Sequence, residues 1–77
     1  MNEKFRNEVI GALKDRGLTD VRYIGQARSR RCEECDIRLY KFRGFKDGFA
    51  WVAYACPKCR HVHMKSLVLL KPILVKI

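Results

Sequence analysis

Four cysteines are the residues of this 77-residue chain whose type and spacing most clearly predict chemistry. They form two pairs, Cys32/Cys35 and Cys56/Cys59, and twenty residues separate the pairs. Two residues between the cysteines of a pair allow a tight turn to direct both sulfurs at one point ~2.3 Å away, as in structural zinc sites. We therefore predict one structural Zn²⁺ ion held by all four thiolates.

The same cysteines could serve other chemistry. An iron–tetrathiolate electron carrier of the rubredoxin type is usually acidic and has glycines around its metal, whereas this chain is strongly basic. Disulfide or thiol-redox chemistry suits an oxidising compartment, but the first residues contain no secretory signal, so we expect a reducing, cytoplasmic location. Intracellular disulfides of hyperthermophiles keep that alternative open. His61 or His63 could also replace a cysteine as a ligand.

The two pairs, together with Pro57, resemble the knuckles of the zinc-ribbon superfamily over roughly residues 30–70. That family usually has glycine after the second cysteine of each knuckle, and this chain has Asp36 and Arg60 there. The departure concerns the fine geometry of the knuckles rather than the metal. Zinc ribbons occur in ribosomal proteins, RNase P subunits, RNA polymerase subunits, transcription factors and viral or plasmid-borne regulators, so the resemblance implies a fold more than a function.

A single domain of this size needs such a staple, because a core of fewer than about 80 residues rarely contributes more than ~3–5 kcal/mol. An amphipathic helix is predicted within residues 1–18. Asn2 can cap it, Gly17 suits the left-handed position after the last turn, and Leu18 would then contact Leu13. The apolar face of this helix is formed by Phe5, Val9, Ile10 and Leu13.

A strand is predicted over residues 21–28, with Val21, Tyr23 and Ala27 on one side and Arg22, Ile24 and Arg28 on the other. Between the cysteine pairs, Asp47-Gly48 predicts a type I′ hairpin turn. The resulting register places Lys46 opposite Phe49, Gly44 opposite Trp51, Phe42 opposite Ala53 and Tyr40 opposite Ala55. One hairpin face then carries Tyr40, Phe42, Phe49 and Trp51, and the other carries Lys41, Arg43, Phe45, Val52 and Tyr54.

We expect the aromatic face of the hairpin to pack on the helix, although Trp51 and its neighbours could instead stack on bases. A last strand should begin at Arg60 and end at Lys71-Pro72. One of its faces carries Val62, Met64, Val68 and Leu70. The other carries His61, His63 and Lys65, and then becomes apolar as well at Leu67 and Leu69. Residues 71–77 are too apolar for a solvated tail. The predicted fold is a small zinc-stapled α+β domain: a helix on a three- to four-stranded antiparallel zinc-ribbon sheet.

The net charge of +9 lies entirely in residues 21–77, which contain 13 basic and four acidic side chains. A zinc ion with four thiolates would lower this to +7. The formal charge of +9 exceeds the magnitude of about 2–8 that solubility alone requires and is typical of surfaces that bind phosphate backbones. The candidate nucleic-acid contacts are Arg28, Arg30, Arg31, Arg38, Lys41, Arg43, Lys46, Lys58, Arg60 and Lys65.

We therefore expect a non-catalytic protein that binds DNA or RNA phosphates through a basic hairpin face. No catalysis is expected, since zinc-ribbon transcript-cleavage factors have adjacent acidic residues at the hairpin tip and this tip has only Asp47. The alternative is a protein-interaction module, a homodimer or a subunit of a nucleoprotein assembly. Residues 67–77, of which eight are apolar, would form its interface. No segment is apolar and long enough to suggest a membrane span.

Overall fold

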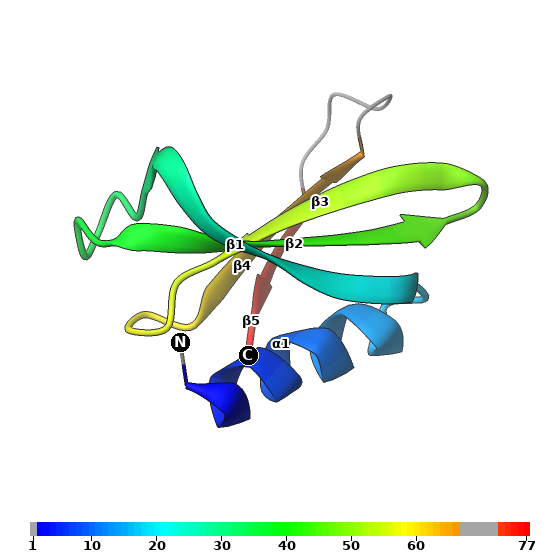
Figure 1. Ribbon diagram of the computed structural model, residues 1–77, viewed down its shortest axis with the longest axis horizontal. Helices are drawn as coiled ribbons and strands as arrows, with labels where there is room; N and C mark the ends of the chain where they lie inside the picture. Colours follow the sequence, from blue (N-terminus) through cyan, green and yellow to red (C-terminus); the bar gives the residue numbers. More distant parts are fainter. Residues whose placement is uncertain (1, 67–72) are drawn as a thin grey trace.

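One helix lies on one face of a five-stranded antiparallel sheet in the computed structural model, which describes residues 2–66 and 73–77 (Figure 1). The helix α1 spans Glu3–Asp15. The strands follow one another in space as in sequence: β1 Thr19–Arg31, β2 Arg38–Lys46, β3 Phe49–Ala55, β4 His61–Ser66 and β5 Ile73–Lys76. The predicted α+β domain is confirmed, with five strands because the C-terminal extension contributes one of its own.

Both ends of α1 have the predicted caps. The side-chain oxygen of Asn2 accepts a hydrogen bond from the backbone nitrogen of Lys4 at 2.8 Å. At the other end, Gly17 has a φ of +93°, the Leu18 amide donates to the Leu13 carbonyl, and the Gly17 amide donates to the Lys14 carbonyl. These are the two bonds of a Schellman ending. They turn the chain directly from the helix into β1.

The hairpin of β2 and β3 has the register that its turn predicts. Asp47 and Gly48 both have positive φ, 54° and 79°, as a type I′ turn requires. Lys46 pairs with Phe49, Gly44 with Trp51, Phe42 with Ala53, and Tyr40 with Ala55. The side chains on one face of the hairpin therefore all point toward α1.

The core lies between α1 and this face. Phe5, Val9 and Leu13 of the helix are buried in one cluster with Phe42 and Trp51 of the sheet. Trp51 is thus a core residue and not an exposed stacking platform. The chain passes close to β2 where it leaves α1, and this approach requires a glycine at position 44. A Cβ on Gly44 would lie 3.0 Å from a methyl carbon of Leu18.

The first strand is longer than predicted and does not alternate throughout. Tyr23 lies opposite Phe42, but Gln26 lies opposite Tyr40, so one extra residue separates them on β1. This bulge includes Gly25, whose φ is +146°. Beyond the bulge, odd-numbered residues of β1 lie on the opposite face of the sheet. Ala27 therefore does not share a face with Tyr23, as strict alternation had predicted. Bulges bend a strand and increase its twist, and the end of β1 curls over the sheet (Figure 1).

The last two strands correct the predicted C-terminal region. The strand β4 begins at His61 rather than at Arg60, which has a φ of +63°. Its predicted continuation through Leu67, Val68, Leu69 and Leu70 to Lys71-Pro72 lies outside the described residues. The strand β5 pairs with β4, with Val62 opposite Val75 and His63 opposite Leu74. The end of the chain therefore packs on its own domain.

The pairing of β5 gives a test of stability. Val75 is 8% exposed and belongs to the core, whereas Leu74, its neighbour on the opposite face, is 59% exposed. Val75→Ala is expected to lower the free energy of unfolding by about 1–3 kcal/mol, since two methyl groups leave the core. Leu74→Ala should change it by less than about 0.5 kcal/mol. Urea unfolding of both variants measures the difference, and equal effects would argue against the assignment of β5.

Candidate metal centre and the open face of the sheet

The four cysteine sulfurs meet at one end of the sheet. All four ligand atoms of Cys32, Cys35, Cys56 and Cys59 lie within 4.8 Å of one another, and the sulfurs of Cys32 and Cys59 are 3.5 Å apart. Sulfurs arranged as a tetrahedron around an ion at 2.3 Å would be about 3.8 Å apart. None of the four forms a disulfide. The cluster could hold a metal ion and is consistent with a zinc-ribbon-like site.

Two equivalent turns position these sulfurs. In the first, which joins β1 to β2, the Cys32 amide donates to the Ile37 carbonyl at 2.9 Å, and the Asp36 amide donates to the Cys32 carbonyl at 2.8 Å. The second turn joins β3 to β4 and repeats this pattern. There the Cys56 amide donates to the His61 carbonyl at 3.0 Å, and the Arg60 amide to the Cys56 carbonyl at 2.9 Å. Each strand pair thus presents a knuckle of the same shape.

The residue after the second cysteine of each knuckle has a left-handed backbone. Asp36 has a φ of 51° and Arg60 a φ of 63°. These are the positions at which the zinc-ribbon family usually has glycine, so the chain keeps that backbone geometry without glycine. A left-handed conformation costs an L-residue about 1–2 kcal/mol. The side chain of Arg60 offsets this cost through contacts described below.

The thiols of the cluster have different acidities. Backbone hydrogen bonds, chiefly from Cys35, lower the pKa of Cys32 from 9.0 to about 7. Burial raises the pKa of Cys59 to about 12 and also raises the pKa of Cys35. At neutral pH, Cys35 and Cys59 therefore hold protons that a bound metal must displace.

A second group of polar atoms adjoins the cluster. A carboxylate oxygen of Glu34 and a ring nitrogen of His61 lie within 4.8 Å of the Cys59 sulfur and of each other. His61 is therefore next to the ligands, as the sequence allowed, but the four cysteines form a complete tetrahedral set without it. Sequence reasoning missed Glu34, because nothing in its spacing relates the first knuckle to a histidine after the second.

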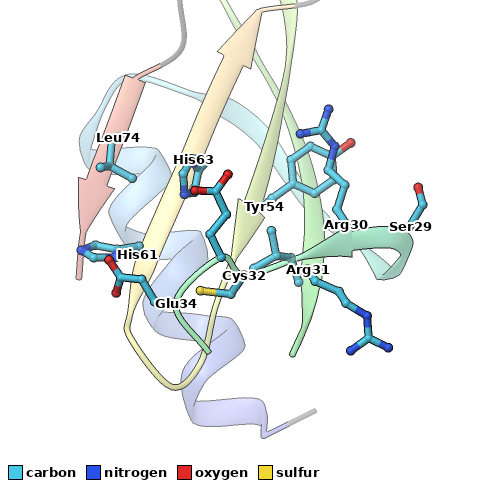
Figure 2. Close-up of a pocket in the computed structure, with 11 residues that line it drawn as sticks. Ser29, Arg30, Arg31, Cys32, Glu34, Tyr54, His61, His63 and Leu74 are labelled. Carbon is cyan, nitrogen blue, oxygen red and sulfur yellow. The ribbon is translucent and has the colours of Figure 1, made fainter. Parts of the chain in front are cut away.

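The sheet face opposite α1, here called the open face, is hollowed at the knuckle end. A groove of about 670 Å³ lies there, and its walls include Arg30 and Tyr54 on one side and His61, His63 and Leu74 on the other (Figure 2). The guanidinium carbon of Arg30 lies 4.6 Å from the centre of the Tyr54 ring. Since Tyr54 belongs to β3, the curled end of β1 reaches across β2 to form one wall.

The register brings several of the predicted cations together on the open face. Arg22 lies opposite Arg43, Arg43 opposite Val52, and Val52 opposite Lys65. These residues form a row across four strands, here called the cation row. The sequence did not single out Arg22, since its partner across the sheet depends on the β1 register. Lys41 lies beside this row, opposite Tyr54.

Two predicted nucleic-acid residues have other positions. Arg60 contacts the helix and the C-terminus: it forms an ion pair with Glu8, donates to the Ile77 carbonyl at 2.9 Å and lies 5.8 Å from the Phe5 ring centre. Lys46 lies on the helix side of the sheet, near Gly17. The other predicted cations are exposed near the knuckles or the end of β1: Arg28, Arg31, Arg38 and Lys58.

The chain matches no protein-family model, no curated protein and no solved structure at a significant level. Among the described residues, the single helix is too short and too polar to cross a membrane.

The cluster predicts one metal ion per chain and a fold that depends on it. Cys56→Ser should abolish stoichiometric metal binding and destabilise the domain, because Cys56 is buried and loses its ligand sulfur. Glu33→Gln, an exposed change in the other knuckle, should retain the metal. Native mass spectrometry of both proteins measures metal content directly. A stable, metal-free wild-type fold would contradict this expectation.

Metal affinity should rise with pH. Binding requires four thiolates, and the raised pKa values of Cys35 and Cys59 mean that at least these two thiols lose a proton on binding near neutrality. Mass action then strengthens binding by a factor of at least about 100 per pH unit above pH 7, where more than half of Cys32 is already ionised. Competition with a chromophoric chelator from pH 7 to 8.5 tests the sign and the slope. A flat profile would contradict the thiol assignment.

Proposed function

We propose that this protein is a non-catalytic zinc-ribbon protein that binds nucleic acid, DNA or RNA, through phosphate contacts on the open face of its sheet. The observation that carries the proposal is the cation row of Arg22, Arg43 and Lys65, which crosses four strands on the sheet face opposite α1. Cations held on rigid strands at strand spacing present a fixed array to a polyanion.

Zinc suits the four-thiolate set best, because Zn²⁺ prefers tetrahedral sulfur ligands in structural sites. A closed set of four thiolates has no free position for water or substrate, so the ion has a structural part in this proposal. It would hold the two knuckles together and thereby fix the strands that carry the cations. A bound zinc ion with four thiolates has a formal charge of −2, which directs phosphates away from the knuckles and toward the cation row.

The charge distribution between the two faces supports the same surface. Strands β2 to β5 contain no acidic residue in the part that the structure describes. In contrast, the helix carries acidic and basic side chains in balance. Near the cation row, Asp20 forms an exposed ion pair with Arg22 at 3.2 Å, a contact worth little in water and easily exchanged for a phosphate.

The double substitution Lys41→Glu/Arg43→Glu should weaken binding to a labelled oligonucleotide more than tenfold. It should also reduce the slope of log affinity against log salt by about 2, since two phosphate contacts are lost. Lys4→Glu/Lys14→Glu makes the same change of charge on the exposed side of α1 and is the matched control. Fluorescence anisotropy from 50 to 300 mM salt measures both, and equal losses in the two variants would count against the open face.

A second candidate is a protein-interaction module. The strand β5 ends the sheet, has a strand partner on one side only among the described residues, and exposes Ile73 and Leu74. Such an edge can pair with a strand of another chain. The mass spectra described for the metal would also report the oligomeric state, and a stable dimer would favour this candidate.

A further inference from the structure

We propose that the groove at the knuckle end of the open face is a seat for an unpaired nucleobase of a single-stranded nucleic acid, stacked on Tyr54. The inference rests on the proposed nucleic-acid function and deepens it, because it names the class of nucleic acid. Duplex DNA and RNA keep their base faces stacked on one another, so only an unpaired base can offer its ring to a side chain.

The position of Tyr54 relative to the cation row suits a single nucleotide. Tyr54 is two residues from Val52 along β3, and Val52 lies within the row between Arg43 and Lys65. Two residues of a strand span about 7 Å. A phosphate bound at the cation row would therefore place the base of its own nucleotide, or the base of the next nucleotide, within reach of the Tyr54 ring.

The groove itself favours a base over a phosphate. Its lining includes two carboxylates and two guanidinium groups, and the four-cysteine cluster adjoins it; the charged side chains are those of Glu33, Glu34, Arg30 and Arg31. With two charges of each sign, the groove lacks the net positive charge of the cation row, whereas a neutral base can donate from its amino groups to a carboxylate and accept from a guanidinium. A nucleic-acid strand would therefore lie with its backbone on the cation row and one base in the groove, whose lining Figure 2 shows.

The walls of the groove provide flat surfaces for stacking. The ring of Tyr54 is half-buried, and the Arg30 guanidinium lies over it, 4.6 Å from the ring centre, so a base would stack on the guanidinium plane or take its place on the ring. Bases stack on both tyrosine rings and arginine planes. Phe45 offers a second ring on the same face, 36% exposed and four residues from Lys41 along β2, with Arg43 at 5.7 Å from it. Two rings about 13 Å apart along the strand direction could hold bases of a short segment.

The test compares a labelled 12-nucleotide single strand with the duplex of the same sequence on the metal-loaded, full-length chain by fluorescence anisotropy. Electrostatics alone favours the duplex, whose charge density is higher. Our proposal instead expects the single strand to bind at least about fivefold more tightly. Tyr54→Leu should weaken single-strand binding by about tenfold, the effect of one lost stacked base, and leave duplex binding and the salt slope unchanged.

Two variants and a crosslink separate stacking from structure. Tyr54→Phe keeps the ring and should retain single-strand affinity, and Phe49→Leu removes a ring that is 42% exposed on the other face of the hairpin and should have no effect. In the wild-type protein, a strand containing 5-iodouracil should crosslink to Tyr54 on irradiation. This last measurement requires no variant to fold.

The outcomes distinguish this inference from the proposed function. Salt-dependent binding with no preference for the single strand, no effect of Tyr54→Leu and no crosslink at Tyr54 would overturn the base seat and leave phosphate binding intact. Binding of neither nucleic acid at 50 mM salt would overturn both. Single-strand preference that is lost in Tyr54→Leu and kept in Tyr54→Phe would support the seat.

Discussion

The rest of the structure depends on the convergence of four cysteine sulfurs from two turns that are twenty residues apart in sequence. The convergence requires the β1–β2 and β3–β4 turns to lie at the same end of the sheet, and therefore the β2–β3 turn to lie at the other. Strands that follow one another in this way are neighbours in space. A domain with so small a core gains from any tie that fixes this order.

Arg60 connects this centre to the rest of the domain. Its backbone completes the second knuckle, while its side chain reaches Glu8 of α1 and the carbonyl of Ile77. One residue thus joins the knuckle, the helix and the end of the chain. Glycine would adopt this left-handed conformation at lower cost. Arginine is explained there by the contacts of its side chain, which glycine could not make.

Local features of this fold could be predicted from the sequence, and non-local ones could not. The Asp47-Gly48 turn fixes the hairpin register through its own backbone, and Gly17 ends the helix through two local hydrogen bonds. By contrast, the bulge at Gly25 depends on how β1 meets β2. The β5 pairing was missed because the sequence predicted one strand from Arg60 to Lys71-Pro72. The cysteine cluster followed from spacing alone, but the groove beside it did not, because its lining comes from all five strands and the first knuckle.

The open face combines exposed aromatic rings, which base stacking would use, with the solubility that exposed rings usually reduce. A single helix can cover only one side of the sheet, so apolar and aromatic side chains such as Phe45 and Leu74 remain partly exposed on the other. Exposed rings promote association unless charges interrupt them. Here Arg43 lies over Phe45 and Arg30 over Tyr54, so each exposed ring is accompanied by a cation of the same face. Cations that prevent the open faces of two protein molecules from associating would also attract a polyanion. The rings beside these cations would then contact the bases of the polyanion. Solubility and single-strand binding therefore favour the same arrangement of side chains.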